Sequence, residues 1–212
     1  MPTETASARP KRRWRRVLWL AIILAAMALY FPINLLAHDG VQLASPLDQA
    51  IPLYPVFIIP YLIASVLFVG LPVWAAFSAR SGEFEFYTIC ILLATAISYI
   101  IYLAYPTYVA RPEVVSQDLF SNAISLLYRT DRAYNAAPSG HAFYCTLSLI
   151  FLSRWKPDFR IIWLALWIII LASTLFTRQH NLLDLACGLA LAGAAYAAGR
   201  YLVQKRDLKF AS

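Results

Sequence analysis

The stretch from Pro55 to Phe77 reads PVFIIPYLIASVLFVGLPVWAAF and contains no charged residue. A helix needs about 20 predominantly apolar residues to cross the hydrocarbon core of a bilayer, so this stretch predicts a transmembrane helix. The whole chain is 61% hydrophobic and 14% charged, which is too little charge to cover a soluble domain. The sequence therefore predicts an all-α, polytopic membrane protein with a six-helix transmembrane bundle. The predicted spans, of which the fourth is short, are Val17–Ala37, Pro55–Phe77, Phe84–Tyr105, Gly140–Ser153, Ile161–Thr177 and Asn181–Val203.

Basic residues orient this bundle. Residues 1–16 form a predicted basic arm and residues 204–212 a basic tail, on either side of a transmembrane domain at residues 17–203. Because Lys and Arg favour the cytoplasmic side, we expect both ends in the cytoplasm of a cell or inner membrane. The first span exceeds the about 7–15 apolar residues of a cleaved signal peptide, so a retained anchor is expected, kinked at Pro32. The net charge of +7 fits contact with anionic lipid and does not indicate a nucleic-acid partner.

Two segments on the predicted outer side are more than simple turns. Ser45-Pro46-Leu47-Asp48 combines a good N-cap, a proline for the first helical position and an acidic first turn, which predicts a short interfacial helix. A second, amphipathic helix is predicted on the same side. Each of the two helices could simply pack on the protein surface, or could admit lipid to the site or cover it as a lid. The second is predicted within residues 106–137 from the helical spacing of Leu119, Phe120, Ala123, Ile124 and Leu127.

The sequence Pro138-Ser139-Gly140-His141 begins the fourth predicted span at its outer end. Proline suits the first position of a helix, and the N–H groups of the three residues after it are expected to be unpaired. With the positive end of the helix dipole they predict an anion site, to which Ser139 adds a hydroxyl and Gly140 a close backbone approach. Arg111 and Arg178 belong to the same membrane face, and each offers a planar fork to phosphate oxygens.

His180 and Asp184 form a second pattern. Their i, i+4 spacing predicts one helical face, and two membrane crossings return His180 to the face that holds His141. A carboxylate that binds one ring nitrogen leaves the other nitrogen free to attack phosphorus. His141 is then expected to protonate the leaving oxygen and later to activate water. Taken singly, a His-x-x-x-Asp pair is more often a structural hydrogen bond or half of a metal site, and an interfacial arginine is more often an anchor.

In this order, the residues resemble the type 2 phosphatidic acid phosphatase family, whose catalytic core is related to that of vanadium haloperoxidases. The family patterns are Lys-x6-Arg-Pro, Pro-Ser-Gly-His and Ser-Arg-x5-His-x3-Asp. The second pattern matches completely. The first matches at Arg111-Pro112, and the third matches at Ser173, His180 and Asp184.

Two family cations are missing from this chain. Ala104 stands at the position of the family lysine, and Thr174 stands at the position of the family arginine. Arg178 is expected to replace one of them, and Arg129 or Arg132 the other.

The resemblance implies a metal-independent phosphohistidine mechanism without a cofactor. The implied catalytic residues are His180 as nucleophile, Asp184 as its partner and His141 as acid, and the implied phosphate-binding residues are Arg111, Ser139, Gly140 and Arg178.

We expect a lipid phosphate phosphatase that hydrolyses a phosphomonoester or diphosphate lipid of the bilayer at the outer face. The segment Thr177-Arg178-Gln179-His180 also looks like branches related to sphingomyelin and inositol-phosphorylceramide synthases, so head-group transfer to an alcohol is an alternative. The alternative of another class is a non-catalytic lipid-binding or transport protein, against which the intact histidines and aspartate argue. The sequence selects neither the lipid nor the oligomeric state.

Overall fold

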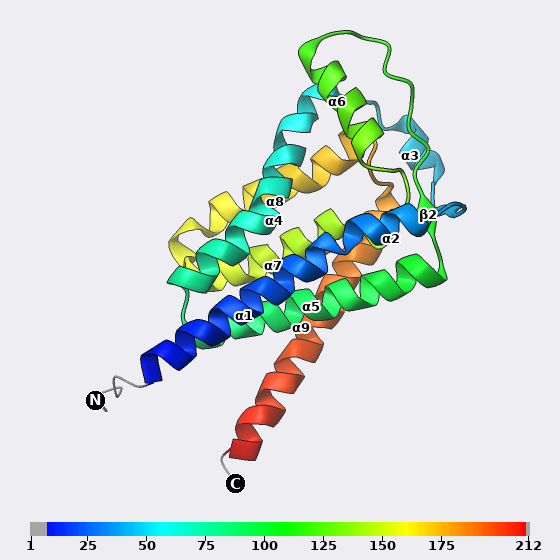
Figure 1. The fold of residues 1–212 in the computed structure, drawn as a ribbon. Coiled ribbons are helices and arrows are strands. Elements are labelled where there is room, and N and C mark those ends of the chain that lie inside the picture. The colour runs from blue at the N-terminus through cyan, green and yellow to red at the C-terminus, as the bar shows by residue number, and fades with distance from the viewer. Residues whose placement is uncertain (1–7, 211–212) are drawn as a thin grey trace.

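The computed structural model describes residues 8–210, with side chains for residues 13–205, and these residues form a helical bundle (Figure 1). Its long helices are α1 (Ala8–Ala28), α4 (Ile58–Ser78), α5 (Ser81–Ala104), α7 (Gly140–Trp155), α8 (Arg160–Phe176) and α9 (Leu182–Phe210). The shorter elements are the helices α2 (Tyr30–Leu36), α3 (Pro46–Ala50) and α6 (Leu119–Thr130), the 3-10 turns η1 (Pro55–Phe57) and η2 (Pro157–Phe159), and the strands β1 (Val41–Gln42) and β2 (Thr107–Tyr108).

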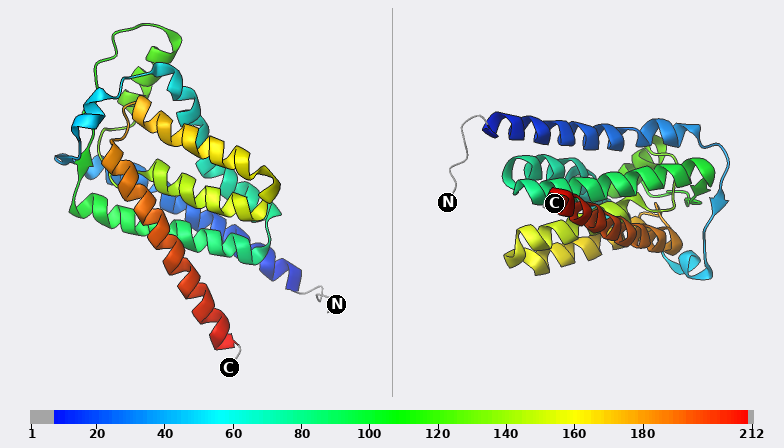
Figure 2. Two further views of the ribbon diagram at one scale, coloured as in Figure 1. Left: turned by 180° about the vertical axis from the view of Figure 1, so that it is seen from behind. Right: turned by 90° about the horizontal axis from the view of Figure 1, so that it is seen from below.

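Helices long and apolar enough to cross a membrane dominate the described chain. The five stretches of this kind are Arg13–Leu36, Pro55–Ser78, Ser81–Ala104, Pro157–Phe176 and Leu182–Lys205. The predicted all-α, polytopic membrane fold is therefore confirmed. The fourth predicted span is α7, which at 16 residues is shorter than the others. It packs against α4, α5, α8 and α9, so neighbouring helices cover much of its length (Figure 2).

The surface of the bundle is apolar. Large side chains with at least two thirds of their area exposed include Val66 on α4, Ile100 on α5 and Ile161 on α8. The interior of the bundle is equally apolar, with Phe84, Ile91 and Phe143 almost fully buried where α5 and α7 meet. A protein that is apolar on both sides of its helices matches a hydrocarbon solvent rather than water.

The first span is broken near Pro32, as predicted. Helix α1 ends at Ala28, and α2 resumes at Tyr30. Proline has no N–H to donate to the carbonyl four residues earlier, which is that of Ala28, and its ring crowds that carbonyl. The helical backbone hydrogen bonds continue on either side of this missing bond. The N–H of Leu29 donates to the carbonyl of Ala25 at 3.1 Å, and the N–H of Ile33 donates to the carbonyl of Leu29 at 3.2 Å.

Both ends of the described chain lie at one end of the bundle, and α3, α6 and the strands lie at the other (Figures 1 and 2). Helix α1 begins at Ala8 and α9 runs to Phe210, so parts of the predicted arm and tail continue these helices. Residues 1–7 and 211–212 of the arm and tail lie outside the described residues. Arg16 of α1 secures the terminal end of the bundle, since it donates to the carbonyls of Ala76 and Ala79 at 3.0 and 2.6 Å.

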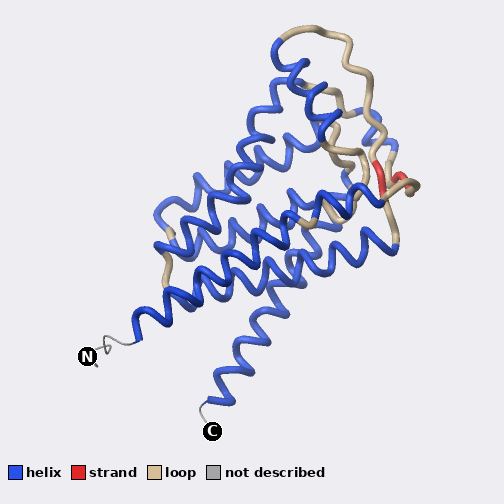
Figure 3. The backbone as a smooth tube through the Cα atoms, in the orientation of Figure 1, coloured by secondary structure: helices blue, strands red, loops and turns tan. Residues whose placement is uncertain are grey.

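The opposite end of the bundle holds the two predicted short helices. Ser45 and Asp48 cap α3 reciprocally, as the sequence indicated. Asp118 caps α6 by accepting hydrogen bonds from two backbone N–H groups. Ile124 of α6 is fully buried against Ile58 and Tyr61, so the apolar face of α6 packs on protein. The parallel pairing of β1 with β2, which the sequence did not indicate, joins the loop after α2 to the loop after α5 (Figure 3).

A glycine allows α9 to approach the start of α7. A Cβ atom added at Gly188 would lie 2.6 Å from the carbonyl oxygen of Ser139 and 2.7 Å from the Cβ of Ala142. Both distances are shorter than van der Waals contact, and neither neighbour is the flexible end of a side chain. The two helices therefore meet here only because residue 188 has no side chain.

Gly188→Ala should consequently lower the thermal unfolding temperature in detergent and displace the start of α7. Gly193→Ala is the matched control on the same helix, because an added Cβ there meets nothing within 4 Å. We expect the control to keep or gain stability, by about 0.5–1 kcal/mol, as a glycine-to-alanine change in a helix does. Equal melting temperatures for the two variants would contradict the packing argument.

Candidate active site

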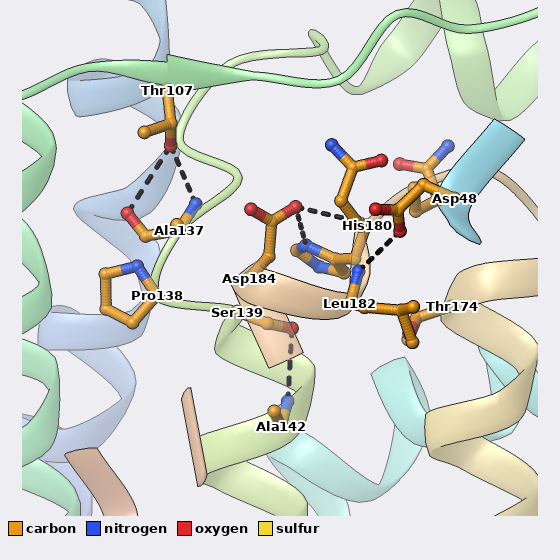
Figure 4. Close-up of polar contacts among 12 residues, drawn as sticks. Asp48, Thr107, Ala137, Pro138, Ser139, Ala142, Thr174, His180, Leu182 and Asp184 are labelled. Atoms are coloured by element: carbon orange, nitrogen blue, oxygen red, sulfur yellow. Dashed lines mark hydrogen bonds and ion pairs between the residues drawn. The ribbon is translucent and has the colours of Figure 1, made fainter. Parts of the chain in front are cut away.

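The Pro-Ser-Gly-His turn is held between α5 and α9. Tyr102 donates a hydrogen bond to the carbonyl of Pro138 at 2.6 Å, and the N–H of Ser139 donates to the carbonyl of Asp184 at 2.9 Å. The hydroxyl of Ser139 accepts from the N–H of Ala142 at 3.2 Å and so caps α7 (Figure 4). The start of α7 is thus fixed directly to the start of α9.

The anion site at this helix start is smaller than the sequence indicated. The expected free N–H of Ser139 was wrong, because the carbonyl of Asp184 accepts it. Ser139 is fully buried and does not line the cavity at the site, so its contact with phosphate stays a prediction. Gly140 and His141 do line that cavity, and the first turn of a helix offers no intrahelical acceptor for their N–H groups.

His180 lies in the loop between α8 and α9. The carbonyl of Thr174 accepts the N–H groups of Gln179 at 3.0 Å and of His180 at 3.2 Å, which folds the loop back on the end of α8. The expectation of a shared helical face for His180 and Asp184 was wrong, since only Asp184 belongs to α9. The pair nevertheless meets around the start of α9, where Nδ1 of His180 is 3.8 Å from Oδ2 of Asp184 (Figure 4).

Asp184 is buried and fixed by the backbone. Its Oδ2 accepts a hydrogen bond from the N–H of Asn181 at 2.7 Å, and its Oδ1 is buried with no hydrogen-bond partner among the described residues. A separation of 3.8 Å from His180 is longer than a hydrogen bond, so the contact is electrostatic. Negative charge at this position stabilises the positive charge that an imidazole gains when it attacks phosphorus.

The rings of the two histidines lie close together, edge to face. The ring centroids of His141 and His180 are 5.6 Å apart. Tyr61 and Phe68 of α4 pack against the His141 ring, with centroid distances of 4.4 and 5.1 Å, and they fix its orientation. The Nε2 atom of His141 is buried and has no hydrogen-bond partner in the described part of the chain. The structure therefore brings together two histidines that are 39 positions apart in the sequence.

Arg111 lies at the same site but does not present an open fork. Its Nη1 donates to the carbonyl of Asp131 at 2.5 Å, and its Nη2 donates to Oε1 of Gln179 at 2.7 Å. Longer contacts of 3.4 Å join the guanidinium to the carbonyls of Tyr128 and Arg132. Its Nε is buried and is the atom without a partner among residues 13–205. A bidentate phosphate contact by Arg111 would require these bonds to rearrange.

Two amides at the site were not singled out from the sequence. Gln179 is buried, and its bond from Arg111 to Oε1 leaves Nε2 as a buried donor with no described partner. Asn135 is also buried, has a left-handed backbone with a φ of 57°, and leaves both atoms of its amide without described partners. Both amides line the cavity. Their proximity in sequence to His180 and to Pro138 was the signal available for finding them.

The cations expected to replace the missing pair are arranged differently. Arg178 has a left-handed φ of 52°, and its Nη1 donates to the carbonyls of Asp48 and Ile51 at the end of α3. It does not line the cavity, so its contact with phosphate stays a prediction. Of the two candidates for the lysine position, Arg132 lines the cavity, whereas Arg129 is exposed and does not.

Helix α3 holds the loop that carries His180. Oδ1 of Asp48 accepts the N–H of Leu182 at 2.7 Å, on the other side of the loop from Asp184 (Figure 4). Burial opposes the ionisation of Asp48, but hydrogen bonds from Ser45 and from Leu182 outweigh it, and the pKa of Asp48 is lowered. Together with the bond from Arg178, this contact ties α3 to both ends of the His180 loop.

The site opens into a cavity of about 490 Å³ whose two parts differ in polarity. Arg111, His141, Gln179 and His180 line the polar part. The other part lies between α1, α2 and α4, and its wall includes Leu24, Met27, Phe31, Leu62 and Val69. Phe31, Leu62 and Val69 are 65, 48 and 49% exposed, so this part reaches the apolar surface of the bundle.

Comparison with known families identifies the chain. A PAP2 superfamily model matches residues 42–198, which is more than half of the sequence. The chain belongs to the PAP2 superfamily. This membership supports phosphatase-like activity, as a lipid phosphatase or phosphotransferase, and the apolar helices fit an integral-membrane PAP2 protein. No curated protein and no solved structure matches the chain significantly.

A metal centre was not expected for this PAP2 protein. Within the described residues, no group of three or more His, Cys, Asp and Glu side chains is arranged to hold a metal ion. Metal independence stays a prediction, which a chelator tests directly.

Asp48→Ala should slow turnover by misplacing His180. A misplacement of about 1 Å can cost on the order of 100-fold in rate, so we expect at least a tenfold loss of kcat with a smaller change of KM.

Because the pKa of Asp48 is lowered, its contribution to stability is complete above the ordinary carboxyl pKa and is lost as pH falls through the lowered value.

Asp118→Ala is the matched control for Asp48→Ala. Asp118 also caps a short outer helix, by accepting from the N–H groups of Phe120 and Ser121, but its described hydrogen bonds do not reach the His180 loop. The control should lose about 1 kcal/mol of stability and keep its kcat. The same loss of kcat in both variants would show that α3 has no particular effect on His180.

Proposed function

We propose that this PAP2 protein cleaves a phosphate ester of a membrane lipid through a phosphohistidine formed at His180. The observation that carries the proposal is the close pair of His141 and His180, with ring centroids 5.6 Å apart, at the polar end of a half-apolar cavity. A phosphoryl group bound beside this pair can contact both a nucleophile and an acid.

The apolar part of the cavity supports a lipid substrate. A phosphate bound near His141 and Arg111 would lie beside a wall of α1, α2 and α4 that is continuous with the apolar surface. An acyl or isoprenoid chain can lie along that wall without leaving an apolar environment, so the tail stays out of water while the phosphate enters the polar part. A soluble phosphate ester would gain nothing from this half of the cavity.

The first chemical step is attack by Nε2 of His180 on phosphorus. Asp184 faces Nδ1 of the ring and stabilises the positive charge that develops on it. His141 donates its proton to the leaving alkoxide as the phosphorus–oxygen bond breaks. The N–H groups of Gly140 and His141 and the Nε of Arg111 are the donors placed to stabilise the phosphoryl oxygens.

In the second step, His141 accepts a proton from water, and the resulting hydroxide displaces His180 from phosphorus. An alcohol in place of water gives transfer of the phosphoryl group instead of hydrolysis. Both outcomes share the phosphohistidine, so transfer is the second candidate function of the same site. A non-catalytic lipid-binding role would leave the unpaired donors of both histidine segments without a chemical use.

We further propose that the site faces away from the cytoplasm. The terminal end of the bundle carries more of the basic residues, including Arg13, Arg15 and Arg16, and the site lies at the opposite end (Figure 1). Positively charged segments remain on the cytoplasmic side during insertion.

His180→Ala should abolish turnover while the protein still folds and inserts, because no other group replaces the nucleophile. Brief incubation of wild type with a ³²P-labelled lipid phosphate should yield an acid-labile, base-stable label, and His180→Ala should yield none. His141→Ala should still form the label slowly, since loss of a general acid costs about 10²–10⁴-fold in rate. A label on His180→Ala equal to that on wild type would contradict the phosphohistidine.

The sidedness of the site can be measured with a membrane-impermeant thiol reagent. In a variant without the three native cysteines, Glu113→Cys is exposed at the site end and should react in intact cells. Asp158→Cys, which is exposed in η2 at the terminal end, should react only after permeabilisation. The reverse pattern would place the site in the cytoplasm.

A further inference from the structure

The charges around the cavity nearly cancel. Apart from tyrosines, the ionisable side chains on its described wall are those of Arg111, Asp131, Arg132, His141 and His180, and Asp184 lies behind His180. The two guanidinium groups carry two positive charges and the two carboxylates carry two negative charges. The net charge around the cavity is therefore zero when both histidines are neutral. Farther out, Arg178 and Asp48 also oppose each other.

Asp131 is the carboxylate that the phosphate chemistry does not use. Its Oδ1 accepts hydrogen bonds from the hydroxyl of Tyr30 at 3.0 Å and from Nδ2 of Asn34 at 3.2 Å. The pKa of Asp131 is raised, because burial outweighs the opposing effects of nearby Arg111 and of the hydrogen bonds from Tyr30 and Asn34. Two donors directed at one oxygen and the adjacent guanidinium of Arg111 stabilise a carboxylate here, so we take Asp131 as charged. It places a negative charge on the same wall that must receive the phosphate.

The unpaired donors of the site are mostly neutral. Arg111 has its two terminal nitrogens bonded to protein oxygens and keeps only Nε free among the described contacts. The side-chain amides on the cavity wall that have a buried, unpaired NH₂ group among the described contacts are those of Gln179 and Asn135. Amide donors bind phosphate oxygens without adding the positive charge that a second phosphate charge requires.

We propose that the phosphate group bound here is a singly charged phosphodiester, with Gln179 and Asn135 as neutral phosphate ligands and Asp131 as the residue that disfavours a dianionic monoester. The proposal deepens the proposed function and rests on it. When His141 carries the proton that it donates as acid, the cavity has one positive charge. A diester matches that charge, and a dianion leaves one negative charge unmatched in a low-dielectric site.

The reaction balances for a diester. Nε2 of His180 forms a bond to phosphorus, the bond from phosphorus to one ester oxygen breaks, and that oxygen takes the proton of His141. The intermediate is a phosphohistidine that keeps the second ester and one negative charge. Water or an alcohol then gives its proton to His141. Its oxygen forms a bond to phosphorus, and the bond between phosphorus and Nε2 of His180 breaks.

The first test compares two lipids that differ by one methyl ester and therefore by one negative charge. Phosphatidate and phosphatidylmethanol with the same acyl chains are assayed at about pH 8.5, above the second pKa of a phosphate monoester, which is about 6. Wild type should turn over the diester with at least about tenfold higher kcat/KM, because like charges in proximity are strongly disfavoured. Higher kcat/KM for phosphatidate would overturn the proposal.

Variants then test whether Asp131 causes the preference for the diester. Asp131→Asn keeps an acceptor for Tyr30 and Asn34 and removes the charge, so the ratio should shift at least about fivefold towards phosphatidate. Asp118→Asn is the control, because it removes an exposed carboxylate outside the cavity and keeps a good N-cap. An unchanged ratio in Asp131→Asn, or the same shift in both, would overturn the assignment to Asp131.

A measurement on wild type decides the charge preference even if Asp131→Asn does not fold. Perrhenate and tungstate are tetrahedral oxyanions of similar size that carry one and two negative charges. Perrhenate should raise the melting temperature of the full chain in detergent more than tungstate does at equal concentration, and the reverse order would overturn the proposal.

Gln179→Leu should weaken perrhenate binding at least about fivefold. Gln204→Leu, an exposed change at the terminal end, should not.

Failure of the proposed function has a different signature. If wild type forms no phosphohistidine with either lipid, the catalytic proposal fails, whereas the order of the two oxyanions still decides the charge preference. If the phosphohistidine forms and phosphatidate is preferred, only the inference on charge fails.

Discussion

The hydrogen bond from the N–H of Ser139 to the carbonyl of Asp184 joins the two halves of the site. It connects the first residues of α7 to the first turn of α9 at 2.9 Å. His141 follows Ser139 by two residues, and His180 precedes Asp184 by four, so this one contact sets the distance between the histidines. Gly188 makes the contact sterically feasible, because any side chain there would collide with the carbonyl of Ser139. The rest of the bundle supports this junction: α5 holds it through Tyr102, and α3 holds the loop on its far side.

Much of the fold was predictable, because a bilayer imposes simple rules on composition. Long uncharged runs such as Pro55–Phe77 indicate helices without further information, and the capped sequence at Ser45 predicted α3 correctly. The break before Pro32 follows from the chemistry of proline alone. The β1–β2 pairing could not be predicted, since two-residue strands carry no periodic signal and depend on where the loops meet in space.

The site was predictable to a lesser extent. The sequence order of the motifs placed both histidines on one membrane face, and the structure brings them together. The hydrogen-bond partners were not accessible to sequence reasoning. Spacing suggested a helical face for His180 and Asp184, but a capping arrangement at a helix start brings i and i+4 together as well. Arg178 was expected to bind the phosphate because it lies close in sequence to Thr174, where the family has an arginine. Its left-handed backbone directs it to the carbonyls of α3, which only the tertiary structure reveals.

The side wall of the cavity also bears on how rate depends on substrate. A lipid that reaches the histidines past Phe31, Leu62 and Val69 arrives by lateral diffusion within the bilayer, without first dissolving in water. Encounter is then two-dimensional, and the variable that governs it is the mole fraction of substrate among the surrounding lipids. Adding inert lipid or detergent at constant bulk concentration dilutes such a substrate and slows an enzyme of this architecture. For a protein with its opening on this surface, the composition of the membrane is itself a kinetic parameter.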